Sequence, residues 1–272
     1  AKALGAAGVQ LFYIVSAYSL CLSFNQRRSS EPHAMRSYLV RRLFRIAPLF
    51  WVAMALYLLR PLYLADSATP VDVHPPTWDL MPWHVLSTLL FVNGWHYQSI
   101  NFIVPGGWSV AVESNFYLLL PFLLAYAVTT RRALVLVGLT LLLAVVARFA
   151  LYRVAGTTAA MHAGEAFGIF AGLWLPAQLP VFALGILMFH CVPRSSLATH
   201  VVASARLWRP LALGALALAL IALAPASWSR YIPSGFQAGL LLLAFSWLVA
   251  WWPHGLVVNR VTQFLGKISY SL

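Results

Sequence analysis

The sequence predicts an all-α fold, a polytopic transmembrane helix bundle with about eight spanning segments plus one short re-entrant or tilted segment. Of the 272 residues, 61% are hydrophobic and only 9% are charged, whereas soluble domains carry about 25% charged residues. Apolar stretches of about 16 to 21 residues recur without the period-2 alternation of a membrane barrel. Because a helix satisfies its own backbone groups in lipid, helices are the expected spanning elements. We expect residues 1–272 to form a single transmembrane domain.

The predicted spanning segments follow one another with short loops between most of them. A further apolar stretch at 84–95 has only about 12 residues, which suits a re-entrant or tilted piece better than a full span. The glycines of "PGGW" (105–108) should allow a tight turn into the next helix, and 153–173 is expected to be a loop. The spans are expected at about 5–24, 44–64, 108–128, 133–152, 174–192, 210–226 and 237–252, and one more begins at about 262.

The basic residues indicate membrane orientation rather than a nucleic-acid partner. The net charge is +12, but Lys and Arg gather in short loops, as the positive-inside rule predicts, and no basic domain with interleaved aromatic residues is present. The stretch 25–45 holds six Arg and should be cytoplasmic, which places 65–80, with three Asp, outside. Arg131 and Arg132 return to the cytoplasm only if 84–95 does not cross, so the rule favours the re-entrant interpretation.

Glu113 is a single acid within the apolar stretch 107–124. An acid at the centre of a membrane helix costs about 2.5–3.5 kcal/mol, and the predicted topology places Glu113 about one to two turns from the outer end of its helix. It is either a general base, a carboxylate that orients a catalytic His, or one side of an interhelical contact that only fixes packing. Arg60 and Arg148 are candidate partners in each case. Helical spacing gives Glu113 four neighbours on the same face of its predicted helix, namely Ser109, Phe116, Tyr117 and Leu120.

Arg42 and Arg45 are three residues apart in "YLVRRLFRIAPLFW" (38–51) and share a helical face, whereas Arg41 points elsewhere. Two guanidinium groups on one face at the cytoplasmic membrane surface can bind a phosphate or pyrophosphate bidentately. Ordinary positive-inside anchoring, with the side-chain stems snorkelling to the interface, is the alternative. In this topology the arginine pair and Glu113 lie at opposite depths.

The histidines and cysteines do not form a recognisable metal or disulfide pattern. His84, His96 and His162 can reach an outer cavity, although ordinary loop positions are the favoured explanation for each of them. No histidine pair has metal-ligand spacing, and Cys21 and Cys191 form neither a disulfide framework nor a metal cluster. We expect no metal site and no tightly bound cofactor.

Four stretches stand out in order along the chain: "GVQLFYIVSAYSL" (8–20), "RRLFRIAP" (41–48), "WSVAVESNFYLLLP" (108–121) and "LGKISYSL" (265–272). They resemble motifs of the acyltransferase 3 family, multi-spanning membrane O-acyltransferases that modify bacterial glycans. "LPVFALGILMFH" (179–190) is a looser fifth match. Ser16-Ala17, Gln10 and Ser114 depart from the family pattern, which leaves the acceptor open.

The resemblance implies an enzyme of the inner (plasma) membrane that moves an acyl group, acetyl in the simplest case, from acyl-CoA to a hydroxyl of a cell-surface glycan. Arg42 and Arg45 would hold the phosphates of acyl-CoA, and Glu113 would be catalytic, holding or polarising the family's histidine. That histidine lies in a helix expected before Ala1, and the last helix would continue beyond Leu272, so this fragment alone should be inactive. The expected supporting residues are Ser16, Trp108, Ser109, Tyr117, Arg60 and Arg148.

A membrane transporter or flippase for a glycan or lipid-linked sugar is the competing interpretation, with Glu113 as a proton or substrate site. Transporters of this kind are often built from inverted repeats with broken helices at the midplane. The sequence has no convincing internal repeat, which favours the acyltransferase. A purely structural membrane subunit would leave the arginine pair and the buried acid without a role.

Overall fold

The structure is a computed structural model, and the chain forms helices connected by turns over the whole described part. The helices are α1 (Lys2–Arg27), α2 (Ala34–Tyr63), α3 (Met81–Leu89), the 3-10 helix η2 (Asn93–Trp95), α4 (Gly107–Tyr126), α5 (Thr130–Ala155), α6 (Ala160–Leu173), α7 (Leu175–Cys191) and α9 (Ser234–Trp251). The residues that the structure describes are 2–28, 31–63, 81–155, 160–192, 214–215, 232–251 and 259–264.

The predicted helical membrane bundle is confirmed. The described residues contain five stretches long and apolar enough to cross a membrane, namely Ala7–Arg27, Ala34–Leu59, Gly107–Tyr126, Thr130–Arg153 and Phe167–Cys191. The predicted span at 237–252 corresponds to the shorter apolar helix Ser234–Ala250. The predicted span 210–226 and the segment from about 262 lie outside the described residues, apart from a few positions.

Two predicted segments were wrong. In both, the apolar pattern of the sequence does not mark where the helix lies. Helix α2 begins at Ala34 rather than near 44, because Arg and Leu are good helix formers whether or not lipid surrounds them. The stretch 153–173, expected as a loop, contains helix α6. Its several alanines favour a helix despite its glycines.

The short segment 84–95 turns back instead of crossing. Helix α3 has nine residues, which is about 14 Å of helix against a hydrocarbon thickness of about 30 Å. The chain then reverses: Phe91 has a φ of 59°, and the Val92 amide donates to the Ser87 carbonyl at 2.8 Å. The predicted turn before α4 is also present, since Gly106 has a left-handed φ of 79° at the helix N-terminus that glycine adopts without strain.

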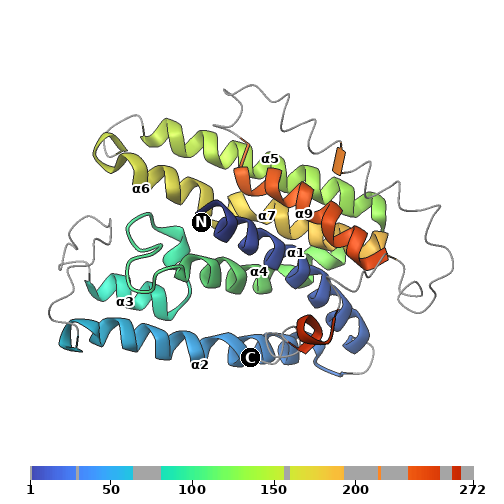
Figure 1. The fold of residues 1–272 in the computed structure, drawn as a ribbon, viewed down its shortest axis with the longest axis horizontal. Helices are drawn as coiled ribbons and strands as arrows, with labels where there is room; N and C mark the ends of the chain where they lie inside the picture. Colours follow the sequence, from blue (N-terminus) through green and yellow to red (C-terminus); the bar gives the residue numbers. More distant parts are fainter. Residues whose placement is uncertain are drawn as a thin grey trace.

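Helix α7 is the centre of the bundle. All its residues from Leu175 to Met188 are buried, and it packs against α1, α5 and α9, which Figure 1 shows side by side. Helices α1 and α7 pack closely at Gly185, where an added Cβ would lie 2.7 Å from Cβ of Ala17. Small residues at such crossings let membrane helices pack backbone to backbone. This contact fixes α1 firmly on one side.

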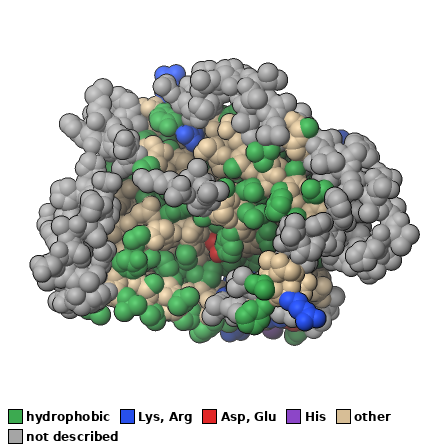
Figure 2. Space-filling view, viewed as in Figure 1, with side chains coloured by type: hydrophobic (Ala, Val, Ile, Leu, Met, Phe, Trp, Pro, Cys, Tyr) green, Lys and Arg blue, Asp and Glu red, His purple; other side chains and the backbone are tan. Residues whose placement is uncertain are grey.

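The opposite side of α1 faces α4 and α2, and this is where the polar residues gather. In Figure 1, α4 lies between α1 and α2, and α2 contacts α4 and α1. In Figure 2, hydrophobic side chains are spread over the described part of this face, with a few Lys and Arg side chains toward its edges and a small acidic area near its middle. The bundle therefore has an apolar centre around α7, and the buried polar contacts of Glu113 lie on the side where α1 and α4 meet near α2.

Candidate active site

Glu113 is buried between α4 and α1 and is bound by two hydroxyl groups. The Ser16 hydroxyl donates to Oε1 of Glu113 at 2.8 Å, and the Tyr117 hydroxyl donates to the same oxygen at 2.6 Å. The side chain is only 6% exposed. Placing an ionisable group inside a membrane bundle costs free energy unless other groups bind it, and such a group is typically functional. Both groups that bind Glu113 here are neutral hydroxyls.

The local sequence explains this arrangement. Tyr117 lies one helical turn after Glu113, so both project from the same face of α4. Ser16 comes from α1, and Tyr13, one turn earlier on that helix, donates its hydroxyl to the backbone oxygen of Ser109 at 3.2 Å. The Tyr13 bond ties α1 to the first turn of α4, and this fixes the height at which Ser16 meets Glu113.

Three stacked aromatic rings form an apolar wall beside the Glu113 carboxylate. The Phe182 ring of α7 lies between two others, with centroid distances of 4.3 Å to Tyr13 and 3.9 Å to Phe116. All three side chains are fully buried. Such a rigid, apolar wall excludes water and strengthens the electrostatic interactions next to it.

Tyr117 also connects the carboxylate to the arginines of α2. The Arg42 guanidinium lies over the Tyr117 ring, 5.7 Å from its centroid, and over the Tyr38 ring at 6.0 Å. The positive charges of Arg45 and Arg42 act on the Glu113 carboxylate. A continuous series of contacts therefore runs from Ser16 through Glu113 and Tyr117 to Arg42.

Arg42, at the end of this series, lines a cavity at the junction of α1 and α2 together with three other arginines. The cavity has a volume of about 170 Å³. Its wall combines four guanidinium groups with two aromatic rings, a serine and an alanine, a composition suited to a phosphorylated ligand. The lining residues are Ser23, Phe24, Arg27, Ala34, Tyr38, Arg41, Arg42 and Arg45.

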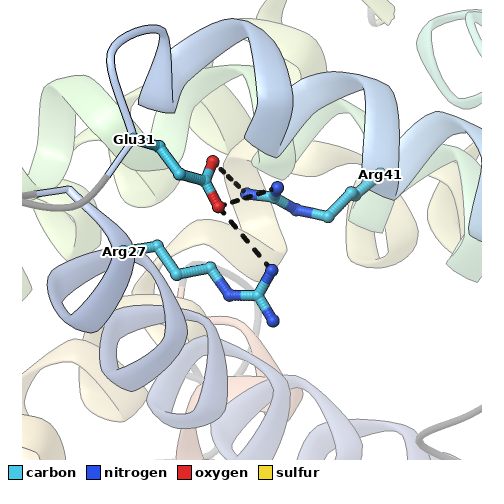
Figure 3. A network of polar contacts seen from close by, with 3 residues as sticks. All are labelled: Arg27, Glu31 and Arg41. Carbon is cyan, nitrogen blue, oxygen red and sulfur yellow. Dashed lines mark hydrogen bonds and ion pairs between the residues drawn. The ribbon is translucent and has the colours of Figure 1, made fainter.

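The predicted split between Arg41 and its neighbours is present. Arg41 is exposed, while Arg42 and Arg45 are half-buried. Figure 3 shows Arg41 turned toward Glu31, with both guanidinium nitrogens 3.0 Å from the carboxylate oxygens, and Arg27 approaching the same carboxylate at 3.8 Å. Arg41 nevertheless lines the edge of the cavity.

The prediction that Glu113 and the arginine pair lie at opposite depths is wrong. Helix α2 begins ten residues earlier than expected, so Arg42 and Arg45 lie inside the helix rather than at its start. Ser16 and Arg45 are each about 11 residues from the α1–α2 junction, about 16 Å along their helices. Ser16, which binds Glu113, and Arg45 therefore lie at similar depth.

The remaining predicted supporting residues fall into two groups. Trp108 and Ser109 contact Tyr13, the former edge-on at 6.4 Å between ring centroids, while the Ser109 hydroxyl donates to the Gly106 carbonyl at 2.9 Å and not to Glu113. Arg148 lies on α5 over the Tyr152 ring at 5.8 Å, and no described contact joins it to Glu113. The side chain of Arg60 lies outside the described residues.

The histidines of the predicted outer cavity take different places. His84 is buried, with Nδ1 2.9 Å from the Ser99 hydroxyl and its ring stacked on Phe102 at 4.0 Å. Burial lowers the pKa of His84, and the charge of His96 lowers this pKa further. The side chain of His162 lies outside the described residues, among which no group of three or more His, Cys, Asp or Glu could hold a metal ion. Cys21 and Cys191 are free.

Sequence reasoning missed three residues that shape the site: Tyr13, Tyr38 and Glu31. Tyr13 precedes Ser16 by one turn, and Tyr38 precedes Arg42 by one turn, so helical spacing could have identified both. Glu31 gave no comparable signal, because its contact with Arg41 depends on how the chain turns between α1 and α2.

The fold and the site together define a multi-pass helical membrane protein with a buried carboxylate beside an arginine-lined cavity. The chain matches the model of the acyltransferase 3 family, an acyltransferase domain, over residues 1–272. It therefore belongs to this family and is a membrane acyltransferase. No curated protein matches the chain. No solved structure matches it either.

Proposed function

We propose that this protein is an O-acyltransferase of the inner (plasma) membrane that moves an acyl group, acetyl as the specific expectation, from acyl-CoA to a hydroxyl of a cell-surface glycan. The observation that carries the proposal is the contact series through Tyr117, which joins the buried Glu113 to Arg42 at the cavity. A cationic site for a phosphorylated donor thereby lies next to a group that can take part in proton transfer.

The chemistry needs both parts. The acceptor oxygen attacks the thioester carbonyl, a C–O bond forms, the C–S bond breaks, and the CoA thiolate leaves. The proton of the acceptor hydroxyl must pass to a base as the bond forms, and the leaving thiolate is then protonated. We assign Glu113 to this proton transfer, as the base itself or as the carboxylate that orients an imidazole base and stabilises its charged form.

Arg42 and Arg45 fit the donor side of the reaction. Guanidinium groups bind phosphate oxygens bidentately and keep their charge at all relevant pH values. Stacking on Tyr38 and Tyr117 holds Arg42 in place, so little side-chain entropy is lost when a phosphate binds. The predicted topology places this cavity on the cytoplasmic side, where acyl-CoA is made, and the glycan would approach from the other side.

The test uses the purified full-length protein with radiolabelled acetyl-CoA, measuring nucleotide binding and label transfer to cell-envelope glycan. Replacing both arginines (Arg42→Gln with Arg45→Gln) should raise the KM for acetyl-CoA by about two to four orders of magnitude, since each charge-assisted bond contributes about 1.5–3 kcal/mol. Arg36→Gln is the matched control, because Arg36 is an exposed arginine of the same helix outside the cavity lining. Absence of both acetyl-CoA binding and acyl turnover in the wild type would refute the proposal and favour a transporter.

A further inference from the structure

The cavity at the α1–α2 junction contains more cationic groups than the Arg42/Arg45 pair. Arg27 and Arg41 also line it, and both bind one carboxylate. The two nitrogens of Arg41 lie 3.0 Å from the two oxygens of Glu31, and Arg27 completes the cluster at 3.8 Å (Figure 3). A fork of guanidinium nitrogens around two anionic oxygens is the geometry by which arginine binds phosphate.

We propose that Arg27 and Arg41 form a second anion subsite of the cavity, which the Glu31 carboxylate occupies in this structure and which takes the ribose phosphate of CoA in the complex. The inference rests on the proposed function, because it assumes that the donor is acyl-CoA. Arg42 and Arg45 then take the pyrophosphate. The adjacent residues Arg41 and Arg42 serve different subsites because neighbouring positions on a helix point about 100° apart.

Glu31 is an exchangeable occupant. Its side chain is 25% exposed, and those of its partners Arg41 and Arg27 are 42% and 52% exposed. Ion pairs in contact with water contribute little net stability, because hydration replaces most of what is lost when they open. A phosphomonoester carries about −1.5 to −2 charges near neutral pH, more than a single carboxylate, so the ribose phosphate displaces Glu31 rather than the reverse.

The test compares CoA with dephospho-CoA, which lacks the ribose phosphate, by equilibrium binding to the purified full-length protein. Wild type should prefer CoA. Glu31→Gln should bind CoA about two- to fivefold more tightly, the range expected for removal of an exposed competing ion pair, with a smaller gain for dephospho-CoA. Arg41→Gln should lose the preference for CoA while still binding dephospho-CoA through Arg42 and Arg45.

Arg36→Gln is the control, because it removes the same charge from the same helix away from the cavity and should retain the wild-type preference. Equal tightening for both nucleotides in Glu31→Gln would indicate a general charge effect and overturn the subsite, as would a preference for CoA that survives Arg41→Gln. These outcomes leave the proposed function intact. If the wild type binds neither nucleotide, the acyl-CoA proposal itself fails.

Discussion

Two carboxylates of the described structure lie in opposite surroundings on the same half of the bundle. Glu31 lies at the α1–α2 junction, where it is partly exposed and forms ion pairs with the guanidinium groups of Arg41 and Arg27. Glu113 lies between α1 and α4, almost fully buried, and is bound by the hydroxyls of Ser16 and Tyr117. The exposed carboxylate has charged partners, and the buried one has neutral partners.

The difference separates two uses of a carboxylate. A guanidinium in direct contact occupies the oxygens of a carboxylate, which suits a structural or exchangeable ion pair. Hydroxyl donors position the carboxylate without neutralising it, so it keeps the capacity to accept a proton or to stabilise a nearby positive charge. The charges of Arg42 and Arg45 still act on Glu113, but Tyr117 stands between its carboxylate and Arg42.

The largest expected effect comes from Glu113→Gln. The amide keeps the shape of the side chain and still accepts from both hydroxyls, but it cannot take a proton or carry a negative charge. We expect acyl transfer in the full-length protein to fall by about two to four orders of magnitude, the usual contribution of general acid–base catalysis. Steady-state transfer assays measure this effect, and melting temperature and membrane insertion should match the wild type. Unchanged transfer would exclude Glu113 from the reaction. Its hydrogen bonds from Ser16 and Tyr117 would then only fix the packing of α1 and α4.

Tyr117→Phe tests the link between the carboxylate and the arginine cavity. It removes the hydroxyl bond to Glu113 but keeps the ring under Arg42, so kcat should fall by about tenfold or more, since bonds to charged groups contribute about 1.5–3 kcal/mol, while the KM for acyl-CoA stays close to wild type. Tyr117→Leu removes both contacts and should raise the KM as well. The matched control is Thr140→Val, which removes a buried hydroxyl whose bonds within the described structure all go to the backbone of its own helix. Equal kcat and KM effects in Tyr117→Phe would contradict separate roles for hydroxyl and ring.

Ser16→Ala should have a smaller effect than Tyr117→Phe. Ser16 is half-buried, so water can replace its hydroxyl, and Tyr117 still positions the same carboxylate oxygen. We expect kcat to fall only about two- to fivefold, about 0.5–1 kcal/mol and less than the full contribution of a bond to a charged group, because water takes over part of the interaction. Ser19→Ala is the matched control on α1, because the Ser19 hydroxyl donates only to the Ser16 carbonyl in the described structure. A loss in Ser16→Ala larger than in Tyr117→Phe would reverse the ranking of the two donors.

Much of the fold could be predicted because lipid imposes a strong pattern on sequence. Apolar stretches of spanning length identify helices, and the positive-inside rule favoured a turn-back at 84–95, which the nine-residue α3 bears out. The start of α2 could not be predicted in the same way. Hydropathy reports where lipid begins, not where a helix begins, and the Arg-rich stretch from Ala34 continues the same helix without a break.

The site was predictable only within each helix. Glu113 is conspicuous because a charge in an apolar helix is costly, and its one-turn spacing identifies Tyr117 as a neighbour. The hydrogen bond from Ser16 joins positions 97 residues apart, and the approach of Arg42 to Tyr117 depends on how α2 crosses α4. Spacing along one helix carries no information about such crossings. The link between Glu113 and the arginine-lined cavity therefore emerged only from the structure.

The smallest effect is expected at the other carboxylate. Glu31→Gln should change the free energy of unfolding by less than about 1 kcal/mol, because an exposed ion pair exchanges its partners for water. The change should shrink further in high salt, which screens exposed charges but not buried ones. Chemical denaturation of the full-length protein at low and high salt measures both quantities. Glu113→Ala should cost more and be insensitive to salt, since it leaves buried hydroxyl groups without their acceptor. A large, salt-independent loss in Glu31→Gln would make the Glu31 cluster a structural clamp and would weaken the contrast between an exchangeable carboxylate and a fixed one.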